Sequence, residues 1–183
     1  MPQSVLVIHG AGEPRRRGGK IYWEPLLGPS LGSHYEVHAP RMPGPDEPKY
    51  AAWSKAVADL LANLDKPVVV GHSLGASVLL KFLSEADSRP PIAGLFLVAT
   101  PYWGPEMPEF ALRSDFASRL RDLSRLYLYH SRDDNCVSMD HLERYSRALP
   151  QAVVRLLDGR GHEFDQPGFP ELVADIQSLG SPT

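Results

Sequence analysis

Six short apolar runs recur along the chain, and longer stretches of mixed apolar and polar residues separate them. Runs such as VLVI, VVV and LFLV have no polar residue at alternate positions, so we expect both faces of each strand to be buried. This pattern is typical of a parallel sheet covered on both sides. The predicted strands span residues 4–9, 35–38, 67–71, 94–99, 126–130 and 153–157.

Between these strands, apolar residues recur at helical spacing. The clearest predicted helix follows Pro48 and has its apolar positions at Trp53, Val57, Leu60, Leu61 and Leu64. Further helices are predicted after the glycine-serine turn at 71–75, from Ser138 as an N-cap to Leu149, and from Pro170 to a stop at Gly180. Residues 10–33 predict no clear element, because Pro25, Gly28 and Pro29 limit any helix there.

The alternation of strands and helices predicts one α/β domain over residues 1–183, with a mostly parallel sheet. In such sheets, ligands bind outside the carboxyl ends of the strands. The loops that follow the predicted strands are therefore the place to search for chemistry.

The most informative stretch, VVVGHSLGAS, puts Ser73 between Gly71 and Gly75 where a buried strand ends and a helix begins. A Gly-x-Ser-x-Gly motif in this context forms a sharp turn that exposes the serine hydroxyl, with glycines where side chains would collide. The alternative is a glycine-rich turn without chemistry. A serine hydroxyl is a weak nucleophile, so it needs a base and a group that orients the base.

His162 is the best candidate for the base, because it lies in GRGHEF, a glycine-flanked loop just after the last predicted strand. The acid is expected in HSRDDNCV after the fifth strand, where Asp134 is favoured and Asp133 remains an alternative. Ser73, Asp134 and His162 are separated by about two and one βαβ units, which brings all three to one sheet edge. A surface histidine and an acidic turn are the alternatives without function.

The oxyanion of an acyl-transfer reaction needs backbone N–H donors. We expect these donors at Leu74, directly after the serine, and at Ala11 in HGAG after the first strand. A candidate substrate pocket comprises His9, Tyr102, Trp103, Met107 and Phe110. Ordinary packing of the proline-rich segment ATPYWGPEMPEF is an equally acceptable reading of the last four.

Composition and charge exclude several kinds of binding partner and cofactor. The net charge of −3 gives no electrostatic reason for binding nucleic acid, and no apolar run is long enough to span a membrane. The single cysteine, Cys136, excludes an internal disulfide framework and is interpreted as a packing residue. The N-terminal sequence lacks the features of a signal peptide. We therefore expect a cytoplasmic protein without a cysteine-rich zinc site, and its protein partners are unknown.

Taken in order, VLVIHGAG, GHSLG, HSRDDNCV and GRGHEF resemble the α/β-hydrolase superfamily. The length and the segment HAPRMPGPDEPKYAAW are most similar to small single-domain serine hydrolases of the RBBP9/YdeN type. The resemblance implies an α/β-hydrolase fold with strand order 2-1-3-4-5-6, helices on both faces and a minimal cap. It also implies a metal-free hydrolase with Ser73 as nucleophile, His162 as base and Asp134 as acid. One departure is Asn135, where many relatives have proline after the acid.

The predicted function is hydrolysis of a small acyl ester, thioester or amide through an acyl-serine intermediate. The alternative is a catalytically weak protein of the same fold that acts by binding a partner, and lyase activity from the same three residues also stays open. A carboxylate nucleophile of the dehalogenase kind is excluded, because position 73 is serine.

Overall fold

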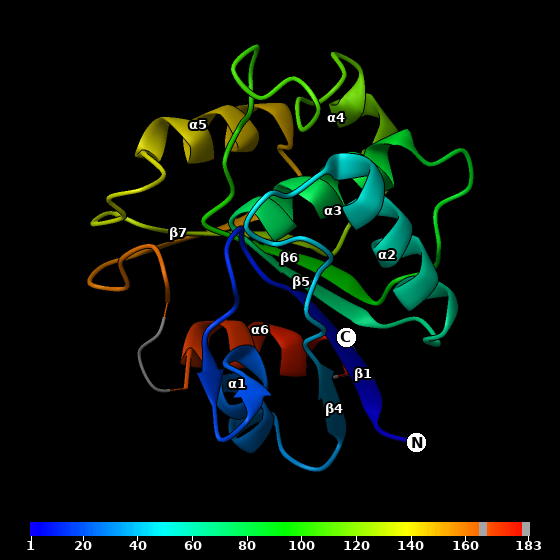
Figure 1. Cartoon of the computed structure of the whole chain (residues 1–183), viewed down its shortest axis with the longest axis vertical. Coiled ribbons are helices and arrows are strands. Elements are labelled where there is room, and N and C mark those ends of the chain that lie inside the picture. The colour runs from blue at the N-terminus through cyan, green and yellow to red at the C-terminus, as the bar shows by residue number, and fades with distance from the viewer. Residues whose placement is uncertain (165–167, 181–183) are drawn as a thin grey trace.

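A six-stranded parallel sheet forms the centre of the protein, in a computed structural model that describes residues 1–164 and 168–180 (Figure 1). Its strands are β1 Gln3–Ile8, β4 Tyr35–His38, β5 Val68–His72, β6 Gly94–Val98, β7 Leu126–Ser131 and β8 Val153–Leu157. They pair in the order β4-β1-β5-β6-β7-β8, and every neighbouring pair is parallel. When the six strands of this sheet are numbered 1 to 6 in chain order, the order is 2-1-3-4-5-6, as predicted. The predicted fold class is therefore confirmed.

Helices cover both faces of the sheet (Figure 1). They are α1 Trp23–Leu31, α2 Tyr50–Ala62, α3 Leu74–Glu85, α4 Phe116–Arg119, α5 Met139–Ala148 and α6 Pro170–Ser178. A short antiparallel hairpin of β2 Arg16–Arg17 and β3 Lys20–Ile21 precedes α1. Between β6 and β7 the chain forms only the four-residue α4, which agrees with a minimal cap.

The alternation of side chains along β1 explains why two helical layers are needed. Leu6 and Ile8 belong to one core cluster, which also contains Trp53 of α2. Val5 and Val7 belong to the opposite cluster, with residues of α1 and α6. Because all four β1 side chains are fully buried, neither face of the strand tolerates polar residues.

Helix α1 was not predicted, since it contains Pro25 and Pro29. Pro25 is the third residue of the helix, where an amide N–H has no intrahelical acceptor anyway. Pro29 removes one hydrogen bond, at a cost of about 3 kcal/mol. Burial of four apolar side chains offsets that cost at about 1.5–3 kcal/mol each; these are Trp23, Leu26, Leu27 and Leu31.

The start of α5 differs from expectation in one detail. Ser138 occupies the N-cap position, as predicted, but its side chain makes no capping hydrogen bond. Its carbonyl instead accepts a hydrogen bond from the His141 N–H at 3.1 Å.

None of the helices in the described part of the chain combines the length and apolarity that a bilayer span requires.

Glycines are required where β5 turns into α3. A Cβ on Gly75 would lie 2.3 Å from the Ile8 carbonyl oxygen and 2.4 Å from that of His9. A Cβ on Gly71 would lie 2.5 Å from the Cα of Ala76. The predicted collisions with a strand and a helix are therefore present, and they involve backbone atoms that cannot move aside.

Replacing Gly75 with alanine should therefore destabilise the protein by about 3 kcal/mol or more, or prevent folding, because the clash is with backbone. Gly28→Ala is the matched control, since an added Cβ there has no neighbour within 4 Å. Its effect should stay within about 1 kcal/mol. Urea unfolding measures both values, and equal losses of stability would contradict this account of the corner.

Candidate active site

Ser73 lies on the turn between β5 and α3 with a strained backbone. Its φ of 51° and ψ of −123° are rare for a residue with a side chain. The Ser73 N–H donates to the Val98 carbonyl at 2.8 Å, which ties the turn to β6. A Cβ on Gly10 would lie 3.1 Å from the Ser73 Cβ, so the loop after β1 also passes close to the serine.

The loop after β8 brings His162 to this serine. His162 Nε2 lies 3.0 Å from Ser73 Oγ, and His162 Nδ1 lies 2.9 Å from Oδ2 and 3.1 Å from Oδ1 of Asp134. A carboxylate only accepts hydrogen bonds, so Nδ1 carries the proton and Nε2 accepts from the serine hydroxyl. Ser73, His162 and Asp134 thus form one continuous hydrogen-bonded chain.

Asp134 is held ionised by its hydrogen bonds. Its side chain is fully buried, and its Oδ1 accepts the Cys136 and Val137 amide N–H groups at 2.8 Å each. Burial by itself would raise the pKa of this carboxyl group. The hydrogen bonds from Val137, His162 and Cys136 outweigh burial and lower the pKa below its ordinary value.

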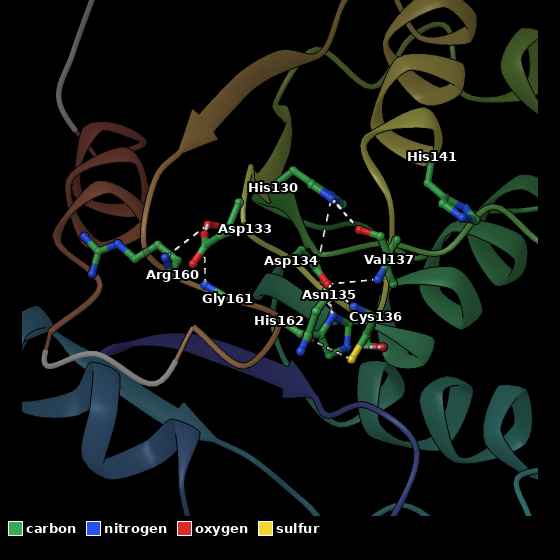
Figure 2. Close-up of polar contacts among 12 residues, drawn as sticks. His130, Asp133, Asp134, Asn135, Cys136, Val137, His141, Arg160, Gly161 and His162 are labelled. Carbon is green, nitrogen blue, oxygen red and sulfur yellow. Dashed lines mark hydrogen bonds and ion pairs between the residues drawn. The ribbon is translucent and has the colours of Figure 1, made fainter.

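Asp133 has a different position. Figure 2 shows Asp134 directed toward His162 and Asp133 directed toward Gly161. Asp133 Oδ1 accepts hydrogen bonds from the Ser131 hydroxyl and, at 3.3 Å, from the Gly161 N–H. The Ser131 oxygen accepts the Arg160 N–H at 3.0 Å. Asp133 and Ser131 therefore hold the two residues that precede His162.

His72 supports His162 from the other side. Its Nε2 lies 2.8 Å from the His162 carbonyl oxygen, so Nε2–H donates to it. The ring contacts the rings of Trp23 and His162, with centroids 5.5 Å and 5.1 Å apart. Burial lowers the pKa of His72 to about 4, which keeps the imidazole neutral near pH 7.

The two backbone N–H groups expected to bind an oxyanion belong to segments next to Ser73. Leu74 is the first residue of α3, so its N–H has no intrahelical acceptor. Ala11 contributes to the lining of the space around Ser73, and its N–H has no acceptor among the described residues. The loop is fixed by His9, whose Nε2 accepts the Met42 N–H at 2.9 Å and whose Nδ1–H donates to the Gly10 carbonyl at 2.6 Å.

Two cavities meet at Ser73 and His162. The first, of about 410 Å³, is lined by His9, Glu13, Arg15, Tyr22 and Trp23, among others. The second, of about 310 Å³, has a mostly apolar lining; its residues include Pro48, Pro101, Trp103, Met107 and Val137. Ser73 therefore borders two spaces whose linings differ in polarity.

The candidate pocket residues divide into two groups. His9, Trp103 and Met107 line these cavities. Tyr102 and Phe110 do not, which corrects the prediction: Phe110 is buried in the core, and Tyr102 packs against other aromatic rings. The segment after β6 turns part of its apolar side chains inward, where burial stabilises the fold more than a pocket would.

Sequence reasoning missed the first cavity and the supporting contacts of the site. The first cavity draws on residues 13–23, where Pro14, Gly18 and Gly19 interrupt any hydrophobic period. The histidine before the serine and the doubled aspartate were visible in the sequence. However, their hydrogen bonds run to loops 90 and 28 residues away, which no local pattern reveals.

The low pKa of His72 predicts acid sensitivity. The unfolded state, with a histidine pKa near 6.5, binds more protons than the folded state between about pH 6.5 and pH 4, so stability falls as pH falls through this window. Between pH 7 and pH 5, His72 should account for a loss of about 2 kcal/mol. His72→Gln keeps an N–H donor for the His162 carbonyl but does not titrate, so its unfolding free energy should depend less on pH.

His34→Gln serves as the control for this measurement, because His34 is exposed. It should retain the pH dependence of the unmodified protein. Identical pH dependence of the unfolding free energy in all three proteins would rule out a neutral, buried His72.

Comparisons with known proteins agree with this fold. Residues 5–124 match the alpha/beta hydrolase family. Over 181 residues the chain is 23% identical to YdeN of Bacillus subtilis (strain 168), covering 94% of this chain and 92% of YdeN. The crystal structure of the ydeN gene product superposes with a TM-score of 0.77 at 20% identity, covering 98% of this chain and all of that one.

A thioesterase domain from the curacin biosynthetic pathway matches with a TM-score of 0.71 at 15% identity, covering 97% of this chain and 90% of that domain. The esterase domain of a Rhodothermus marinus protein matches with a TM-score of 0.68 at 16% identity, covering 97% and 87%. With the family match over residues 5–124 and the sheet order described above, the chain belongs to the α/β-hydrolase family and is similar to its YdeN type.

Proposed function

We propose that this α/β-hydrolase is a serine hydrolase that cleaves a small acyl ester through an acyl-serine intermediate. The observation that carries the proposal is the hydrogen-bonded chain from Ser73 Oγ through His162 to the buried Asp134. A strained serine with an imidazole acceptor at 3.0 Å has the geometry of an activated nucleophile.

In the proposed reaction, Ser73 Oγ attacks the acyl carbonyl carbon while its proton moves to His162 Nε2. The ionised Asp134 accepts the hydrogen bond from Nδ1–H and stabilises the imidazolium that forms. His162 then gives the proton to the leaving alcohol, and the acyl-serine remains. Water, deprotonated by His162, attacks the acyl carbonyl carbon, and His162 returns that proton to Ser73 Oγ as the acid leaves.

The oxyanion of each tetrahedral intermediate would be bound by the Leu74 and Ala11 N–H groups. Such donors act strongly when they are fixed before the reaction begins. Leu74 is fixed by α3, and Ala11 follows directly after the loop residues that His9 holds. The two N–H groups therefore need little reorientation when negative charge develops on the oxyanion.

We assign the acyl group to the apolar cavity beside Trp103 and Met107. Its volume of about 310 Å³ lies at the small end of ligand pockets, which suits a short to medium acyl chain. The leaving group would occupy the more polar cavity, whose lining includes Glu13, Arg15 and Tyr22. Esters and thioesters share this chemistry, and the structural relatives include a domain named for each.

Substitutions of the three residues test the mechanism. Ser73→Ala should abolish labelling by a fluorophosphonate probe and lower kcat/KM for p-nitrophenyl esters by about 10⁴ or more. Asp134→Asn should lower kcat/KM by about 10⁴, because the imidazole loses the acceptor that fixes its tautomer.

Asp133→Asn is the matched control for Asp134, since it alters the neighbouring carboxylate and keeps an acceptor for Ser131 and Gly161. Its loss of kcat/KM should be much smaller. Labelling that persists in Ser73→Ala, or equal losses in the two aspartate variants, would refute the assignment.

The acyl cavity is tested with p-nitrophenyl esters from acetate to decanoate. While the cavity fills, each added methylene should raise kcat/KM about fourfold, from about 0.8 kcal/mol of burial. Met107→Trp should shift the optimum to shorter chains, whereas the volume-conserving Met107→Leu should keep it. An unchanged optimum in Met107→Trp would place the acyl chain elsewhere.

A further inference from the structure

Cys136 lies beside the candidate active site and is exposed, in contrast to the packing role expected from the sequence. Its thiol, an Asp134 carboxylate oxygen and a His162 ring nitrogen all lie within 4.8 Å of one another. Figure 2 shows the three side chains grouped together, although they come from the loops after β7 and β8. Asp134 and His162 already have a place in the proposed mechanism, but Cys136 does not.

We propose that Asp134, Cys136 and His162 form an inhibitory binding site for a soft divalent cation such as Zn²⁺. The binding follows from the arrangement of the three donors, and the inhibition rests on the proposed function. The ion would act as a reversible inhibitor and not as a cofactor of the reaction.

The three donors are the kinds that zinc prefers. Thiolate, imidazole and carboxylate ligands are common in four-coordinate zinc sites, with water as a fourth ligand. An exposed thiol gives the ion access from solvent. Cys136 also lines the apolar cavity next to Ser73 and His162, so an ion that enters this cavity meets two of its ligands.

Asp134 is already oriented to serve as a ligand. Two backbone N–H groups bind its Oδ1, while Oδ2 is directed to His162. A metal ion can take Oδ2 without breaking the backbone contacts, which then act as an outer shell that holds the carboxylate. His141 lines the same cavity, but its Nδ1 already accepts the Tyr102 N–H at 2.8 Å.

Coordination by His162 Nδ1, the nitrogen that lies 2.9 Å from Asp134 Oδ2, would remove the base. When Nδ1 binds the ion, the ring proton shifts to Nε2, and the Ser73 hydroxyl loses its acceptor. The imidazole stays neutral, and the one proton released to solvent comes from the Cys136 thiol.

The experiment measures binding and inhibition separately on the full chain. Zinc affinity is obtained by competition with a chromophoric zinc indicator, and Co²⁺ binding is followed by its thiolate charge-transfer absorption. Hydrolysis of p-nitrophenyl acetate is measured against Zn²⁺, with each rate divided by the rate of the same variant in excess chelator. Cys136→Ser is the test variant, and His34→Gln, which lacks an exposed histidine outside the site, is the control.

The unmodified protein and His34→Gln should bind one Zn²⁺, show the thiolate band with Co²⁺ and lose hydrolysis reversibly. Cys136→Ser should bind Zn²⁺ at least about 100-fold more weakly, which exceeds the usual effect of losing an outer-shell contact, and should need correspondingly more Zn²⁺ for inhibition. Mg²⁺ should not inhibit, because it avoids thiolate ligands.

Zinc affinity that is unchanged in Cys136→Ser, or a Co²⁺ complex without the thiolate band, would overturn the proposed site. Zinc binding through Cys136 in a protein that hydrolyses no ester would support the site and would contradict the proposed function instead.

Discussion

The approach of α3 to the end of β1 controls the geometry of this protein. At Gly75 the helix backbone lies so close to the Ile8 and His9 carbonyl groups that no side chain fits between them. This contact fixes the turn that carries Ser73, and it brings the loop after β1 beside the serine. The strain in the Ser73 backbone persists because β6, through the Val98 carbonyl, holds the same turn from the other side.

The candidate site is held mainly by backbone contacts. His162 is fixed at its carbonyl by His72, and the residues before it are fixed by Asp133 and Ser131. Asp134 is fixed by the amides of its own loop. Because each side chain that would react has a separate anchor, its position does not depend on a bound substrate, which is the arrangement that preorganised catalysis requires.

Neighbouring residues of the candidate site differ sharply in solvent exposure. The Asp134 side chain is fully buried and the His162 side chain is 11% exposed, whereas Cys136 beside them is exposed. The apolar cavity next to Ser73 connects this thiol with the serine and the imidazole. The surroundings proposed for acyl transfer thus also contain a set of metal ligands, and the same imidazole would serve either purpose.

Local pattern was sufficient to predict the sheet and to single out Ser73 and His162 as candidates at its edge. Runs such as VVV and LFLV indicate strands buried on both faces, and the glycines around Ser73 indicate a turn, since both are consequences of nearest-neighbour sterics and burial. Tertiary structure decided the rest. Helix α1 forms across two prolines because its apolar side chains are buried against the sheet. Asp134 rather than Asp133 meets His162, and Phe110 turns into the core, because those choices depend on contacts between segments far apart in the chain. Hydrophobic period and turn chemistry are local and can be read from sequence, whereas packing between distant loops is set only when the whole chain has folded.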